Sequence, residues 1–164
     1  MEKNITPDIK KQEHRIAECE RFMREALKEA RLAFDNKEVP IGAVIEYNGE
    51  IFARGRNRRI EKNSSISHAE IEAIQDACKK LGDWRLENMT IYITSEPCLM
   101  CAGAIVHSRI KKVVYGCKEP KMGAIESRHR VFDIENDIEY IGGILEKECS
   151  GILTRFFENI RKEK

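Results

Sequence analysis

The chain has 164 residues, of which 29 are basic and 28 acidic, giving a formal net charge of +1 at pH 7. This length predicts one domain over residues 1–164, with a structured core of about 12–162, because two ordinary domains need a longer chain. The near-zero net charge excludes a strong overall electrostatic field that would attract nucleic acid. No apolar run predicts a membrane span or a leader. We therefore expect a cytoplasmic protein with no membrane partner. Its six cysteines would stay reduced, so a close pair of thiols indicates metal binding or catalysis.

Apolar periodicity predicts helices and strands in alternation. A helix is expected over about 12–34, followed by two strands, 41–47 and 50–56, on either side of Asn48-Gly49, a dipeptide that favours hairpin turns. The remaining predicted elements are helix 68–81, strand 89–94, short helix 98–107, strand 112–116, strand 138–144 and helix 145–161. This order predicts an α/β fold with three α/β/α layers, built on a central mixed sheet of about five strands with helices on both faces.

One charged segment stands out from the near-neutral background. Residues 54–62 read RGRNRRIEK, with five basic residues from Arg54 to Arg59 and Lys62 against the single acid Glu61. Clustered Lys and Arg can form a phosphate-binding surface, although such runs are more often a solvated face.

Two cysteines lie three residues apart in SEPCLMC, residues 95–101. If a helix begins near Pro97, Cys98 and Cys101 face the same side, and the first-turn amides favour their thiolate forms. A redox pair would have the same geometry. His68 opens the preceding helix, and a parallel crossover would bring the two helix starts together. One nitrogen and two sulfur ligands suit zinc, and three ligands with an open position are typical of a catalytic zinc site.

Glu70 has two interpretations. Ser67-x-x-Glu70 fits a capping box, in which the Glu side chain would only accept a bond from the helix start. Together with the cysteines, however, the chain carries H-x-E followed by P-C-x-x-C, the signature of zinc deaminases that act on nucleobases, in which the Glu is the acid/base and not a ligand.

The chain resembles the bacterial tRNA adenosine deaminases, which convert adenosine to inosine at the wobble position of a tRNA anticodon, over about residues 22–163. The resemblance rests on VPIGAVI at 39–45, Asn57 in GRNR, HAEI at 68–71, WRL at 84–86, EPCLMCAGAIVHSRI at 96–110 and ECSGILTRFF at 148–157. It implies a cytidine deaminase-like fold, here one CMP/dCMP-type deaminase domain, that acts as a homodimer on a tRNA anticodon stem-loop.

Site roles follow from the resemblance residue by residue. His68, Cys98 and Cys101 would hold one Zn²⁺ per subunit, and Glu70 would transfer protons. Asn57 would hydrogen-bond the flipped-out base, although its place between arginines near a strand end fits a turn role equally well from the residues alone. Phe157, at the end of the closing helix, would contact the anticodon loop. Because Phe156 and Phe157 are adjacent on a helix, we expect one of them to be core. Arg56, Arg58 and Arg59 are the nearest candidates for phosphate contacts.

Some positions depart from the family pattern. Ser64-Ser67 precede His68 in place of the usual residues, Glu119 stands where Asp or Asn is usual, and Glu126 replaces a common Gly. Glu119 belongs to a loop that shapes the mouth of the site in the family, so it is a candidate substrate contact. These changes leave catalysis intact but keep a second hypothesis open, a deaminase of a free nucleobase or nucleoside such as guanine, adenine or cytosine. A noncatalytic, zinc-stabilised nucleic-acid module is a third hypothesis, against which Glu70 argues.

Overall fold

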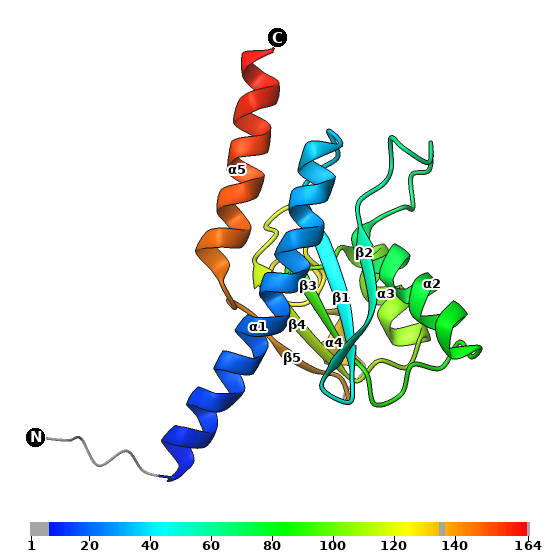
Figure 1. The fold of residues 1–164 in the computed structure, drawn as a ribbon, viewed down its shortest axis with the longest axis vertical. Helices are drawn as coiled ribbons and strands as arrows, with labels where there is room; N and C mark the ends of the chain where they lie inside the picture. The colour runs from blue at the N-terminus through cyan, green and yellow to red at the C-terminus, as the bar shows by residue number, and fades with distance from the viewer. Residues whose placement is uncertain (1–6, 135–136, 164) are drawn as a thin grey trace, which may run out of the picture.

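The structure is a computed structural model that describes residues 7–134 and 137–163. Its strands are β1 (Gly42–Tyr47), β2 (Glu50–Arg56), β3 (Thr90–Ser95), β4 (Lys112–Cys117) and β5 (Glu139–Ile141). They form one sheet in the order β2-β1-β3-β4-β5 (Figure 1). β1 pairs antiparallel with β2 and β3, whereas β4 and β5 continue in parallel with β3. The mixed, five-stranded sheet is as predicted.

Helices cover both faces of the sheet. They are α1 (Pro7–Asp35), α2 (Ala69–Leu81), α3 (Leu99–His107), α4 (Val131–Ile134) and α5 (Glu146–Lys162). Figure 1 shows α1 and α5 on one face of the sheet and α2 and α3 on the other. Strand alternation explains these layers, because Val44 and Tyr92 pack with α1 and α5, while their neighbours Ile45 and Ile91 pack with α2 and α3. The predicted three layers are confirmed. No helix in the described part of the chain combines the length and apolarity that crossing a membrane requires.

Two boundaries and one additional helix differ from the sequence-based expectation. α1 begins at Pro7 and not near residue 12, and residues 8–18 are exposed, so this part of the helix has no buried stripe for periodicity to detect (Figure 1). The single-turn helix α4 was not predicted, since one turn is too short to show a period. β5 ends at Ile141 because the chain turns at Gly143, which has a φ of 85°.

A glycine on β2 sets the position of α2. A Cβ atom added to Gly55 would lie 2.2 Å from the carbonyl oxygen of Ala69 and 2.4 Å from the amide nitrogen of Ala73. The first turns of α2 therefore rest directly on the β2 backbone. Since His68 immediately precedes α2, this close approach also fixes His68 relative to the sheet.

Candidate metal centre and active site

The candidate metal ligands lie at the starts of two neighbouring helices. His68 precedes α2 and Cys98 precedes α3, and both have extended backbones, with ψ angles of 157° and 173°. Nδ1 of His68 lies 3.7 Å from Sγ of Cys98 and 3.6 Å from Sγ of Cys101, and the three ligand atoms all lie within 4.8 Å of one another. The fold thus brings together the three residues that the sequence singled out.

These distances can be compared with the geometry that zinc requires. Tetrahedral zinc with a Zn–N bond of about 2.0 Å and a Zn–S bond of about 2.3 Å would separate nitrogen from sulfur by about 3.5 Å. Both observed nitrogen–sulfur distances agree with this value. One imidazole and two thiolates also form a set of ligands that zinc accepts, and three protein ligands leave one coordination position open. The residues therefore fit a catalytic zinc ion.

The electrostatics of the cluster favour a cation as well. Hydrogen bonds with Cys101 and then His68 lower the pKa of the Cys98 thiol to about 4, so Cys98 is a thiolate at neutral pH. The hydrogen bond with Cys98, and then burial, raise the pKa of Cys101. The hydrogen bond with Cys98 also raises the pKa of His68. A divalent cation would neutralise this group and displace the protons held by Cys101 and His68.

Glu70 is buried beside the ligand cluster, with only 4% of its surface exposed. Burial raises the pKa of its carboxyl group, and the negative charge of Cys98 raises it further. The capping box is not formed, because the residue that caps α2 is His68, whose own side chain makes no cap hydrogen bond. Since His68 is extended and not helical, the two side chains are not forced to opposite sides of a helix. A buried carboxyl group whose pKa is raised is suited to accept a proton and donate it again.

Asn57 connects the end of β2 to the start of α2. Its side chain is buried, and Oδ1 accepts a 2.9 Å hydrogen bond from the amide of Ala69, the first residue of α2. The sequence left a turn role and a contact with the base open for Asn57, and it did not predict this bond to α2. The Oδ1 half of the amide is thus occupied by the protein, which leaves the Nδ2 half as the donor that faces the neighbouring cavity.

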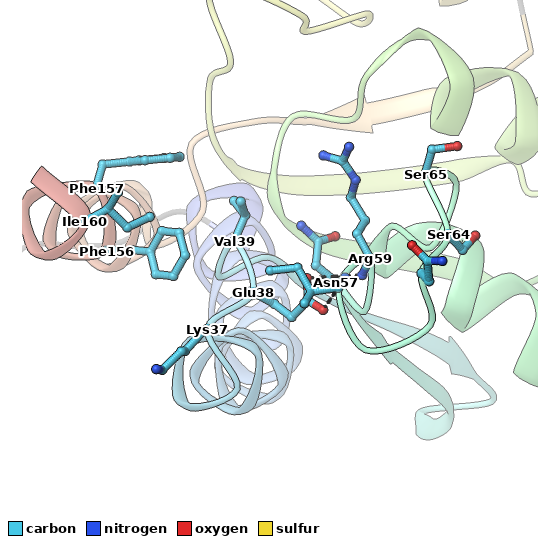
Figure 2. A pocket seen from close by; sticks show the side chains of 12 residues that line it. Lys37, Glu38, Val39, Asn57, Arg59, Ser64, Ser65, Phe156, Phe157 and Ile160 are labelled. Atoms are coloured by element: carbon cyan, nitrogen blue, oxygen red, sulfur yellow. Dashed lines mark hydrogen bonds between the residues drawn. The ribbon is translucent and has the colours of Figure 1, made fainter. Parts of the chain in front are cut away.

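A cavity of about 820 Å³ opens next to Asn57. It lies between the α1–β1 connection, the segment after β2 and the end of α5 (Figure 2). Figure 2 shows Phe156, Phe157 and Ile160 on one side, and Asn57, Arg59, Ser64 and Ser65 on the other. Phe156 is buried and Phe157 is 46% exposed, so one of the two phenylalanines is core, as predicted, and the other presents its ring to the solvent side of the cavity.

The arginines of the basic run have different surroundings. Arg58 makes two hydrogen bonds to the carboxylate of Glu61, and Arg56 lies 3.9 Å from Glu29. Neither lines the cavity, whereas Arg59 does. A run of like charges in the sequence cannot show which members find acidic partners across the fold. The structure therefore favours Arg59 over Arg56 and Arg58 as a substrate contact.

The two unusual acids after β4 are hydrogen-bonded within the protein, one to its own loop and one to β4. Oε1 of Glu119 accepts a 2.9 Å hydrogen bond from the amide of Lys121. Oε2 of Glu126 accepts a hydrogen bond from the hydroxyl of Tyr115. Both side chains are half-buried, so neither extends freely into the surrounding solvent.

Two buried carboxylates escaped the sequence analysis. Glu38 accepts hydrogen bonds from the amides of Arg59, Ile60 and Glu61, and Glu96 accepts bonds from the loop after β4. Both are 3% exposed. The sequence feature that could have indicated a buried carboxylate is an acid next to a buried segment and a proline. Glu38 stands two residues before Pro40, and Glu96 stands between β3 and Pro97.

Comparison with known proteins gives consistent matches. A family model described as MafB19-like deaminase matches residues 17–161. The tRNA-specific adenosine deaminase of Bacillus subtilis (strain 168) is 49% identical over 152 residues, which are 91% of this chain and 94% of that protein. The protein of the same name from Rickettsia typhi (strain ATCC VR-144 / Wilmington) is 44% identical over 144 residues, 85% of this chain and 97% of that protein. A solved structure from "Biochemical and Structural Studies of A-to-I Editing by tRNA:A34 Deaminases at the Wobble Position of Transfer RNA" has a TM-score of 0.78 and 44% identity, covering 81% of this chain and 99% of that chain.

Proposed function

This chain belongs to the MafB19-like deaminases and, among them, to the tRNA-specific adenosine deaminases, and on that premise we propose that it converts adenosine to inosine at the wobble position of a tRNA anticodon. The observation that carries the proposal is the meeting of His68, Cys98 and Cys101 with the buried carboxyl of Glu70 at two helix starts. A tRNA substrate would place the reaction in the cytoplasm.

His68, Cys98 and Cys101 would hold one zinc ion per chain. When bound there, zinc supplies Lewis-acid chemistry that lowers the pKa of water toward neutrality. The protein holds the ligands through the two helix starts: the amide of Ala69 is bonded to Asn57, and the amide of Ala102 is bonded to the carbonyl oxygen of Cys98 at 2.8 Å. Both helix starts are therefore fixed before any substrate binds.

Glu70 would move the protons of the reaction. It would take a proton from the attacking water and pass it to N1 of the adenine, which makes C6 electrophilic enough for attack. It would then pass a proton to the exocyclic nitrogen, so that ammonia leaves and C6 keeps a carbonyl oxygen. The raised pKa of its buried carboxyl group suits a residue that must both accept and release a proton near pH 7.

The cavity beside Asn57 would hold the RNA around the target base. Nδ2 of Asn57 would donate to a ring nitrogen of the purine, and Phe157 would stack on a neighbouring base. A volume of about 820 Å³ is near the upper end for small-molecule sites and would hold a single free base loosely. Arg59 and Lys37 line the same cavity and would contact phosphates. These features favour RNA over a free nucleobase.

The partner copy of a homodimer would cover α3. This helix has no charged residue other than the histidine at its end, yet Leu99 is 52% exposed and Met100 is 36% exposed. A helix that is apolar on every side is normally buried. We therefore expect sedimentation to give a mass near twice 19.0 kDa. A stable species of 19.0 kDa would contradict the homodimer.

The function can be tested by measuring ammonia release from the purified zinc form. Separate reactions would contain an anticodon stem-loop with adenosine at the wobble position, the same stem-loop with guanosine there, free adenosine, and free guanine, adenine and cytosine. The proposal expects turnover of the adenosine stem-loop alone. Turnover of a free base or nucleoside without turnover of the RNA would replace it with the small-molecule hypothesis.

A further inference from the structure

The segment that carries Cys98 is held from two sides. On one side is α3, because the carbonyl oxygen of Cys98 accepts the 2.8 Å hydrogen bond from the amide of Ala102. On the other side are residues 118–127, which we call the β4 loop. Gly123 of this loop forms a β-bridge with Cys98, and the amide of Ala124 donates a 2.9 Å hydrogen bond to the carbonyl oxygen of Pro97. The place of the Cys98 side chain therefore depends on the β4 loop as well as on its own helix.

The β4 loop folds around the carboxylate of Glu96, which is 3% exposed. Oε1 accepts hydrogen bonds from three consecutive amides, those of Ile125 at 3.0 Å, Glu126 at 2.7 Å and Ser127 at 2.9 Å. Oε2 accepts one from the amide of Glu119 at 3.1 Å and one from the hydroxyl of Ser127. Successive backbone amides that converge on one point form an anion-binding arrangement. One carboxylate thus ties together residues from both ends of the loop.

These donors, and not a cation, compensate the charge of Glu96. Among the ion pairs within residues 7–134 and 137–163, none includes Glu96. Hydrogen bonds to an ionised acceptor are stronger than those between neutral groups. A glutamine in the same place would offer one oxygen and one NH₂ group, so some donors of the loop would face another donor. Glu96→Gln would therefore release part of the loop while keeping the volume of the side chain.

Gly123 connects Glu96 to Cys98 through direct packing. A Cβ atom on Gly123 would lie 2.5 Å from Oε2 of Glu96 and 2.5 Å from the carbonyl oxygen of Glu119. The residue that bridges to Cys98 therefore lies against the carboxylate that anchors the loop. Because close-packed groups transmit a displacement to their neighbours, a shift of the Glu96 carboxylate would reach Cys98 through this one residue.

We propose that Glu96 is a positioning residue of the metal centre, which sets the place of Sγ of Cys98 through the β4 loop and so determines the affinity of the site for zinc. The inference rests on the proposed function only in that it needs the metal ion, and it needs no RNA. Glu96 acts through Gly123 and Pro97 and does not bind the ion itself. Residues that orient the ligands of a metal typically change its affinity about 10- to 100-fold when they are replaced.

The test is the zinc dissociation constant of each purified variant, measured by competition with a chelator, together with the absorption spectrum of the cobalt-substituted form. Glu96→Gln should raise the zinc Kd about thirtyfold. It should also weaken the thiolate-to-cobalt charge-transfer band, because Sγ of Cys98 is no longer held in place. Glu87→Gln is the same substitution at an exposed position before β3, and it should leave the Kd and the spectrum unchanged.

A second control separates the metal centre from general stability. Ile152→Ala truncates a buried side chain of α5 that packs with α1, on the opposite face of the sheet from α2 and α3. It should lower the midpoint of urea unfolding and yet leave the zinc Kd and the cobalt spectrum unchanged. An affinity loss in Ile152→Ala equal to that in Glu96→Gln would overturn the inference, because any destabilised variant would then bind zinc weakly.

A zinc Kd for Glu96→Gln within about twofold of the original value would also overturn the inference. If Glu96→Gln does not fold, Ser127→Ala decides in its place. It removes one donor to Oε2 and should raise the zinc Kd about threefold, and an unchanged Kd would count against Glu96 as the anchor. Turnover of the stem-loop is measured separately. Tight zinc binding without turnover would therefore remove the proposed function and leave the role of Glu96 standing.

Discussion

Substitution of Glu38 tests quantitatively what anchors the segment after β2, which lines the cavity. Its Oε1 accepts hydrogen bonds from the amides of Ile60 at 2.7 Å and Glu61 at 2.9 Å, and its Oε2 accepts one from the amide of Arg59 at 3.1 Å. Glu38→Ala removes all three. At a net value of about 1 kcal/mol per bond, the free energy of unfolding should fall by about 3 kcal/mol. Glu38→Gln keeps the oxygen at one position and loses the charge and the bond to Arg59, so it should cost about half as much.

The assay is urea unfolding of the zinc form, with Glu50→Ala in the exposed β1–β2 hairpin as the control. For an m-value of about 2 kcal/mol/M, Glu38→Ala should lower the midpoint by about 1.5 M, and Glu38→Gln should fall between Glu38→Ala and the control. Equal midpoints for Glu38→Ala and Glu50→Ala would refute the assignment of Glu38 as the anchor of the segment after β2.

Other variants distinguish residues that act in proton transfer from residues that support metal binding, substrate binding or folding. Glu70→Ala should retain zinc and lower kcat about a thousandfold, and loss of zinc would remove its role as acid/base. A chelator should abolish deamination and added zinc should restore it, so activity that survives complete zinc removal would exclude a catalytic metal. Phe157→Ala should raise KM for the stem-loop several-fold without changing stability, whereas Phe156→Ala should cost about 3 kcal/mol of folding free energy; the reverse pattern would contradict their assignment. Gly55→Ala should destabilise the protein by about 2 kcal/mol and weaken zinc binding, because its Cβ would press on Ala69, and normal zinc affinity would show that β2 does not position α2.

The fold and the meeting of the three candidate metal ligands could be predicted because their signals are local. A periodic apolar pattern determines which face of a strand or helix is buried, so Val44 and Ile45 could be expected on opposite faces from sequence alone. The spacing between Cys98 and Cys101 is similarly local. His68 could be added because a parallel crossover restricts where the preceding helix begins.

The missed features all depend on contacts between distant parts of the chain. Glu38 and Glu96 look like ordinary surface acids in the sequence, and only the tertiary structure shows the amides that they bind. Arg56 and Arg59 belong to one short segment, yet Arg56 lies 3.9 Å from Glu29 of α1 and Arg59 lines the cavity. For Asn57, a side chain with two different polar ends can serve the fold and the substrate at once, which a motif assigned to one role does not reveal.

The placement of the candidate metal ligands at helix starts divides the chain into parts that can change independently. His68, Cys98 and Cys101 depend on the first turns of α2 and α3. The connections after α1 and β2 line the cavity together with the end of α5, and the connection after β4 contacts Cys98. Substitutions in those connections, such as the acids at 119 and 126, can alter which nucleotide is admitted while the reaction centre is inherited intact. Such a division allows one deaminase scaffold to acquire new substrates by loop replacement, and it marks these three connections as the segments to vary when the selectivity of the enzyme is redesigned.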